Sequence, residues 1–173
     1  HILACELHDS LGGMLSLLRL KIGGNASKDE TLRLLDTTHT ELRRISHHLM
    51  PEELLRGGLV SALRDFARSV PGAAFQTYGD IRLSKEWELT LYRCAFELVN
   101  NAMKYAEATH IDIQLIQTVH EVTLTVSDNG KGMGDGNGMG LQNIRERIEP
   151  YHGTLRIVSS ENEGTEINLT LPL

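Results

Sequence analysis

Residues 130–140 read Gly-Lys-Gly-Met-Gly-Asp-Gly-Asn-Gly-Met-Gly, directly after an apolar segment that ends at Asp128. Glycine lets backbone N–H groups approach an anion closely. We expect a helix to begin near Leu141, so that its unpaired N–H groups and positive dipole end face this loop. The stretch therefore predicts a phosphate-binding loop between a strand and a helix. Taken alone, it is equally typical of a surface loop without a ligand.

The segments around this loop carry helical and strand patterns. Apolar residues three and four apart predict helices, whereas alternating or continuous apolar runs predict strands. We expect helices over 52–70 (broken near Gly57-Gly58), 84–106 and 141–149, and strands over 73–78, 110–118, 121–127, 154–159 and 165–171. Such mixing predicts an α+β fold whose residues 51–173 form a two-layer α/β sandwich with a mixed sheet.

The first fifty residues predict two helices joined at Gly23-Gly24-Asn25. The second helix begins with the capping box Ser27-x-x-Glu30 and ends before Pro51. Both helices carry an apolar stripe, and a single hairpin of this size has little core of its own. We therefore expect residues 1–50 to form a homodimer through a four-helix bundle, with residues 51–173 as a separate domain. Packing of the hairpin onto its own chain is the alternative.

The net charge of −6 argues against nucleic acid or an anionic membrane as the main partner. No apolar run approaches the roughly 20 residues that a membrane helix needs. The two cysteines, Cys5 and Cys94, do not form a disulfide framework, which favours a reducing cytoplasm. Because the sequence opens inside an expected helix without Met, we interpret it as a fragment, with any membrane contact made by an upstream region.

Three polar residues share one face of the expected helix 84–106. Glu97 and Asn101 are four residues apart, and Lys104 follows three residues later. A carboxylate and an amide oxygen are suitable ligands for Mg²⁺, and a lysine can act as a point charge on phosphates. A solvated polar face is the alternative. The pair Asn100-Asn101 opposes helix propensity, which favours a functional interpretation.

The order of these motifs resembles that of sensor histidine kinases, in particular a nitrate-sensor-like subfamily. The segment from Glu97 to Ala106 resembles the family's N-box, and Asp128 to Met133 resembles the first glycine box. Further matches are Gly138-Met-Gly140-Leu141 to the second glycine box, Gly164-Thr165 with Leu171-Pro172 to the closing motif, and Glu6-Leu7-His8-Asp9-Ser10-Leu11 to the phosphoacceptor box. The resemblance covers nearly the whole chain.

The resemblance implies a Bergerat-type fold that binds ATP and Mg²⁺. Asp128 would accept a hydrogen bond from the adenine amino group, and Thr165 would help to seat the base. Asn101 would hold Mg²⁺ beside Glu97. The remaining nucleotide-binding residues implied by the matched boxes are Lys104, Tyr105, Gly130, Gly132, Gly138, Gly140 and Leu141.

The resemblance also implies an ATP-dependent protein-histidine kinase. His8 would be the nucleophile, and Asp9 would accept a hydrogen bond from the second imidazole nitrogen. The phosphoryl group would pass to an aspartate of a response-regulator receiver domain. By the family's habit, the full-length protein would be anchored in the bacterial inner membrane. A conformational ATP-binding module, or a degenerate kinase scaffold without phosphotransfer, is the alternative.

One position departs from the subfamily pattern. Five residues after His8, the subfamily places a glutamine that is thought to orient water for dephosphorylation of the partner. Here the position is Gly13, which has no side chain. We therefore expect weak or absent phosphatase activity.

Overall fold

A computed structural model describes residues 52–133 and 139–173, together with Leu32 and Leu35. The chain divides into two compact units, His1–Pro51 and Glu52–Leu173. In the first unit, Leu32 and Leu35 have helical backbone and are about half exposed. The expected hairpin and dimer, with His8, Asp9 and Gly13, otherwise lie outside the described residues, as does Gly138, and these expectations stay predictions.

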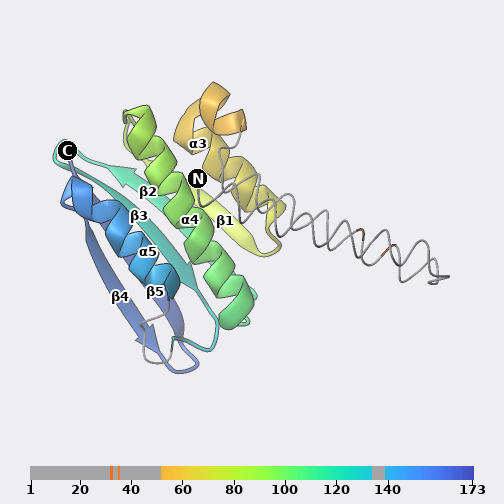
Figure 1. Cartoon of the computed structure of the whole chain (residues 1–173). Coiled ribbons are helices and arrows are strands. Elements are labelled where there is room, and N and C mark those ends of the chain that lie inside the picture. Colours follow the sequence, from red (N-terminus) through yellow and green to blue (C-terminus); the bar gives the residue numbers. More distant parts are fainter. Residues whose placement is uncertain (1–31, 33–34, 36–51, 134–138) are drawn as a thin grey trace, which may run out of the picture. The chain divides into compact units, whose positions relative to one another are not determined.

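The second unit is built on one five-stranded sheet (Figure 1). Its strands are β1 (Ala73–Tyr78), β2 (Ile111–Gln117), β3 (Glu121–Asp128), β4 (Thr154–Ser160) and β5 (Gly164–Pro172), in the spatial order β1-β2-β3-β5-β4. β1 pairs with β2 in parallel, and the other three pairings are antiparallel. The predicted mixed sheet is therefore confirmed, with strand ends within one residue of those expected from the sequence.

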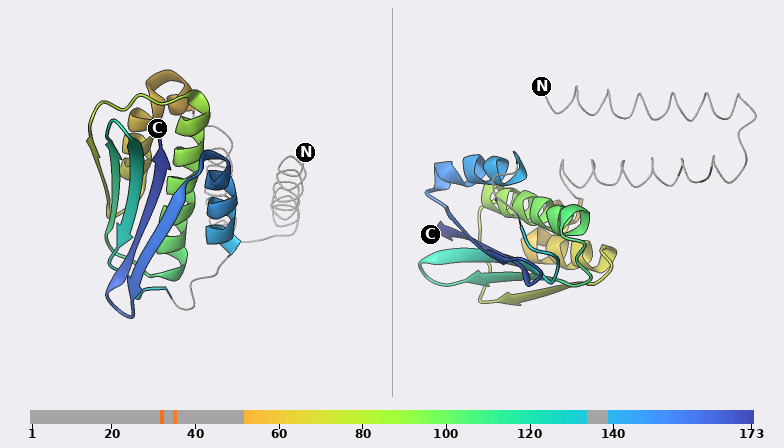
Figure 2. Two further views of the ribbon diagram at one scale, coloured as in Figure 1. Left: turned by 90° about the vertical axis from the view of Figure 1, so that its left-hand side faces the viewer. Right: turned by 90° about the horizontal axis from the view of Figure 1, so that it is seen from below.

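The helices α3 (Glu52–Ser69), α4 (Lys85–Tyr105) and α5 (Met139–Ile148) cover one face of this sheet (Figure 2). The opposite face carries polar cross-strand pairs: the hydroxyls of Thr123 and Thr170 lie 3.1 Å apart, and the Thr125 hydroxyl donates to Asn168. This arrangement is a two-layer α/β sandwich, as the sequence predicts. Within the described residues, no helix is long and apolar enough to span a membrane.

The core lies between α4 and the sheet. The side chains of Leu91, Ala95, Leu98 and Ala102 on α4 are at most 4% exposed, and they share one core cluster with Ile113, Leu124 and Leu169 from the strands. α4 starts after the N-cap Ser84, whose Oγ accepts a hydrogen bond from the Trp87 N–H, and ends at the C-cap Ala106. The helical period and the cap therefore position α4 as expected.

α3 departs from regular helix geometry, and α5 departs from the bounds expected from the sequence. α3 is kinked at Gly58, whose φ of 74° and ψ of −176° are not helical, at the position where the sequence predicts a break. α5 begins at Met139 rather than Leu141 and ends at Ile148 rather than Glu149. A 3-10 turn, η1 (Glu149–Tyr151), follows because Pro150 has no N–H to continue the helix.

Candidate functional site

Asp128 ends β3 at the centre of the sheet. Its register partners are Ile111 on β2 and Thr165 on β5. The Oδ1 atom of Asp128 accepts a hydrogen bond from the Gly130 N–H at 2.9 Å, which closes a turn after the strand. Among the described residues, the Oδ2 atom has no hydrogen-bond donor. One carboxylate oxygen therefore shapes the turn, and the other is left to accept a hydrogen bond from a ligand.

Asn129 holds this turn against the connection between α4 and β2. Its Oδ1 accepts hydrogen bonds from the backbone N–H groups of Thr109 at 3.0 Å and His110 at 2.9 Å. Its Nδ2 donates to the Thr109 hydroxyl at 3.0 Å. No role for Asn129 was predicted from the sequence. The signal was available, because Asn between Asp and Gly is typical of side-chain-stabilised turns.

Thr165, the strand neighbour of Asp128, is only 6% exposed. It follows Gly164, whose φ of 88° lies in the region that favours glycine, and a Cβ on Gly164 would collide with the Asp128 carbonyl. The close approach of the two strands at this point brings Asp128 and Thr165 together. The buried Gly130 and the half-buried Gly132 lie in the turn that leaves β3.

The start of α5 lies directly against Glu97 and Asn101 on α4. A Cβ added to Gly140 would stand 2.7 Å from the Glu97 Oε1 and 3.0 Å from the Asn101 amide nitrogen. Leu141, only 2% exposed, anchors this turn of α5 in the core. Glycine at residue 140 therefore lets a helix N-terminus, with its unpaired N–H groups, meet a carboxylate and an amide.

The two neighbouring asparagines of α4 have different environments. The Asn100 side chain donates a hydrogen bond to the Phe96 carbonyl at 2.8 Å, one turn earlier in the helix. The Asn101 side chain has no hydrogen bond to another described residue. The unusual Asn-Asn pair therefore divides into a local backbone role for Asn100 and a free amide for Asn101.

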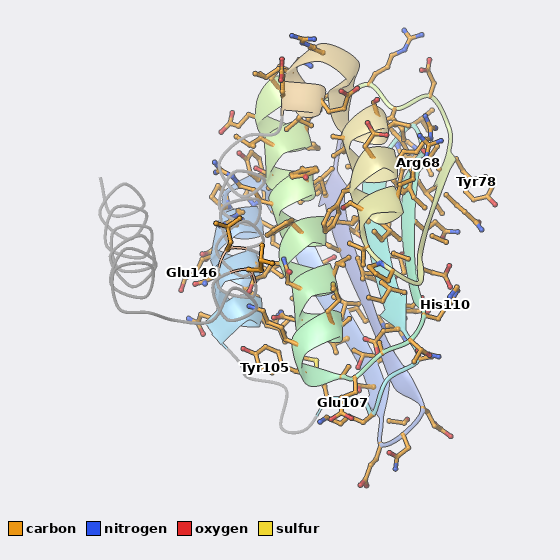
Figure 3. All side chains as sticks on the ribbon, turned by 90° about the vertical axis from the view of Figure 1, so that its right-hand side faces the viewer. Arg68, Tyr78, Tyr105, Glu107, His110 and Glu146 are labelled. Carbon is orange, nitrogen blue, oxygen red and sulfur yellow. The ribbon has the colours of Figure 1, made fainter. Side chains whose placement is uncertain are left out.

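The end of α4 carries the other two candidates. Lys104 is exposed. Tyr105, the last residue of the helix, is 67% exposed, and Figure 3 shows it at the end of α4. Glu107 follows two residues after Tyr105. Its carboxylate accepts a hydrogen bond from Lys131 at 2.8 Å, and this lysine lowers the pKa of the Glu107 carboxyl. Lys104 makes no ion pair with a described residue, so its charge is available to an anion.

The donor set at Glu97 and Asn101 fits Mg²⁺. One carboxylate and one amide oxygen suit an ion that takes its remaining ligands from water and phosphate oxygens. A metal site closed by the protein alone is a different arrangement, and no cluster of three or more His, Cys, Asp or Glu occurs in the part of the chain that the structure describes. Cys94 is not a candidate nucleophile, because burial raises the pKa of its thiol to about 12.

The sequence of this chain is similar to a protein family and to several curated proteins. The family described as histidine kinase-, DNA gyrase B-, and HSP90-like ATPase matches residues 87–173, which is half of the chain. Similar curated proteins include the sensor protein VraS of Staphylococcus haemolyticus strain JCSC1435, 27% identical over 189 residues, and VraS of Staphylococcus aureus strain COL, 27% identical over 191 residues. Both alignments cover 99% of this chain, which spans 54% of each relative.

The fold also matches solved structures. The histidine kinase domain of the Erythrobacter litoralis EL346 blue-light activated histidine kinase aligns with a TM-score of 0.59 and 15% identity, covering 95% of this chain and 96% of that one. This likeness confirms the expected Bergerat-type kinase fold. The nitrate-sensor-like subfamily stays a prediction. With its family match over residues 87–173, the chain belongs to the histidine kinase-, DNA gyrase B-, and HSP90-like ATPases.

Proposed function

We propose that this chain is the core of a two-component protein-histidine kinase, in which residues 52–173 bind MgATP and phosphorylate His8. The observation that carries the nucleotide site is the contact of Gly140 with Glu97 and Asn101. It joins a helix N-terminus to a carboxylate and an amide, the groups suited to phosphates and their cation. Relatives that are named sensor proteins support the signalling role.

In this proposal, Asp128 and Thr165 hold the base. The free Asp128 Oδ2 accepts a hydrogen bond from the exocyclic amino group of adenine, and Thr165 contacts the base from the neighbouring strand. Lys104 and the amides at the start of α5 stabilise the phosphate charge. Glu97 and Asn101 would hold Mg²⁺, which would neutralise part of the charge on the phosphate oxygens.

His8 is the proposed nucleophile. One imidazole nitrogen attacks the γ-phosphorus, forming an N–P bond as the bond to the ADP oxygen breaks. Asp9 accepts a hydrogen bond from the other nitrogen and stabilises the cationic ring. The phosphoryl group then passes to an aspartate of a response-regulator receiver domain. Dimerisation through residues 1–50 belongs to the same proposal.

The direct test is incubation with γ-labelled ATP and Mg²⁺. We compare the wild type with His8→Ala, Asn101→Ala and the matched control Asn100→Ala, since the Asn100 side chain donates a hydrogen bond to the backbone of its own helix. We expect acid-labile, base-stable label on the wild type and the control alone. Label that survives His8→Ala would show that a different residue is the acceptor.

A second candidate is a conformational ATP-binding module. It is favoured by the breadth of the matched family, which also includes DNA gyrase B-like and HSP90-like ATPases. This candidate predicts tight ATP binding without label on His8, so the same experiment separates the two.

The proposal also includes weak or absent phosphatase activity, because Gly13 offers no side chain to orient water. The test measures the decay of an aspartyl-phosphate receiver domain with and without the chain. Gly13→Gln is the gain-of-function variant, and we expect it to accelerate decay relative to the wild type. Strong acceleration by the wild type would disprove this part of the proposal.

A further inference from the structure

Ser159 lies near the end of β4, outside every motif used above. It pairs in register with Thr165 on β5. Its Oγ accepts a hydrogen bond from the Met133 N–H at 2.7 Å and lies 3.0 Å from the Thr165 Oγ1 and 3.2 Å from the Gly164 carbonyl oxygen. One half-buried hydroxyl therefore joins the glycine-rich segment to the strand that carries Thr165.

The hydrogen-bond inventory of Ser159 limits what Thr165 can do. A serine hydroxyl has one proton and two lone pairs, and the Met133 N–H takes one lone pair. If Ser159 donates to Gly164, Thr165 can donate to Ser159 and keeps its own lone pairs. If Ser159 donates to Thr165, the Thr165 proton remains free. In both arrangements Thr165 is held in place yet retains hydrogen-bonding capacity for a ligand.

The segment around Met133 is fixed from two sides. On one side, the Lys131 N–H donates to the Ala106 carbonyl at the end of α4. On the other side, the Asn162 N–H donates to the Lys131 carbonyl, and a Cβ on Gly132 would collide with the Ser160 carbonyl. Ser159 adds the only side-chain hydrogen bond to this second side among the described residues. The segment that follows Asp128 is thus tied to the β4–β5 hairpin.

A second hydroxyl pair in the same sheet provides a comparison. Thr123 on β3 and Thr170 on β5 are also register partners, with hydroxyl oxygens 3.1 Å apart. This pair lies on the polar face, and neither hydroxyl has a third hydrogen-bond partner among the described residues. It serves as an ordinary cross-strand contact. The contact of Ser159 with Met133 is therefore additional to what strand pairing requires.

We propose that Ser159 is a positioning residue of the nucleotide site. Through Met133 and Thr165 it holds the segment that follows Asp128 against β5, so that Asp128 and Thr165 are in place before ATP binds. The inference rests on the proposed function, in which Asp128 and Thr165 hold the base. A positioning role requires that loss of the hydroxyl weakens ATP binding more than it slows phosphoryl transfer.

The test compares Ser159→Ala with the control Thr123→Val, since each removes one hydroxyl from a cross-strand pair. For Ser159→Ala we expect the Kd for MgATP, measured by calorimetry, and the KM to rise about tenfold, with kcat within about twofold. We expect Thr123→Val to leave the Kd for MgATP unchanged. The two variants should lower the thermal midpoint by about the same amount. Ser159→Thr, which retains the hydroxyl, should restore the wild-type Kd.

Two outcomes are distinguished by a further variant, Asp128→Asn. An unchanged Kd in Ser159→Ala, with a clear loss of affinity in Asp128→Asn, overturns the positioning role and leaves the nucleotide site in place. An unchanged Kd in Asp128→Asn instead overturns the proposed function. A rise in Kd for Thr123→Val equal to that for Ser159→Ala also overturns the inference, because general loosening of the sheet would then explain both.

Discussion

At the scale of single residues, the site depends on what neighbouring side chains leave free. Asn100 bonds to its own helix backbone, whereas Asn101 beside it keeps its amide available. Asp128 uses one oxygen for the turn and keeps the other. Gly140 has no side chain, and this allows α5 to touch Glu97. In the proposed site, one atom or group at each of these positions makes a structural contact or close approach, and another is left free for a ligand.

Gly140→Ala should weaken MgATP binding without destabilising the protein. The added Cβ would displace the Glu97 carboxylate, and we expect Kd to rise about tenfold. Alanine favours a helix over glycine by up to about 1 kcal/mol, so the free energy of unfolding should not fall. Calorimetric titration and urea unfolding measure the two effects. The loss of affinity should be smaller in EDTA, and an equal loss there would contradict a role of residue 140 at the cation.

Asn129→Ala should destabilise the fold, because the N–H groups of Thr109 and His110 lose their acceptor. We expect a loss of about 1–3 kcal/mol in the free energy of unfolding, measured in urea. Asn129→Asp keeps the accepting oxygen and loses only donation to the Thr109 hydroxyl. The free energy of unfolding should therefore fall less in Asn129→Asp than in Asn129→Ala. An equal fall in both variants would mean that the lost acceptor for these two N–H groups is not the cause.

At the scale of elements, the helices are set by their ends and breaks. Ser84 and Ala106 bound α4, and Pro150 ends α5. The kink in α3 has a second support, since the Glu88 Oε1 on α4 accepts a hydrogen bond from the Leu59 N–H at 3.4 Å. The second half of α3 therefore starts at a fixed place against α4, and its residues Leu59 and Leu63 are buried.

Gly58→Ala should destabilise α3, in contrast to Gly140→Ala. The φ of 74° and ψ of −176° at Gly58 belong to a region that is essentially restricted to glycine. We expect the free energy of unfolding to fall by about 1–3 kcal/mol, as measured in urea. A free energy equal to that of the wild type would mean that α3 can straighten through this position at little cost.

At the scale of the whole molecule, one sheet face buries titratable groups in the core. Tyr92 and Cys94 on α4 are fully buried, and burial raises the pKa of both side chains, that of Cys94 from 9.0 to about 12. A group with a higher pKa in the folded state stabilises the fold below its unfolded pKa, and this contribution is lost as pH rises. The fold should therefore weaken in alkali.

The unfolding free energy should decline from about pH 9, approaching a slope of about 1.4 kcal/mol per pH unit from Cys94. Tyr92 adds to the decline only above its unfolded pKa near 10. Urea unfolding at pH 8, 9 and 10 measures the slope. Cys94→Ala should remove the decline between pH 9 and 10. An unchanged decline in that variant would assign it to other groups.

The helices, strands and motif positions of residues 52–173 followed from local signals, because caps, apolar spacing and prolines act within a few residues. The α3 break, the β1 boundaries and the two-layer class were predicted in this way and confirmed. The ends of α5 were predicted two residues late at the start and one residue late at the end, since a glycine-rich segment gives no clear start signal.

By itself, the sequence determined which residue types stand at which spacing: Glu97 and Asn101 on one helix face, Asp128 after an apolar strand, and glycines where a backbone must come close. Only the tertiary structure decided the strand order β1-β2-β3-β5-β4, the contact of Gly140 with Glu97, and the link from Ser159 to Met133 and Thr165. The physical reason is the separation along the chain between the residues that interact. Helix periods and caps depend on neighbours in the chain, whereas strand order and the hydrogen bonds of a single hydroxyl depend on segments that meet only after the core has formed.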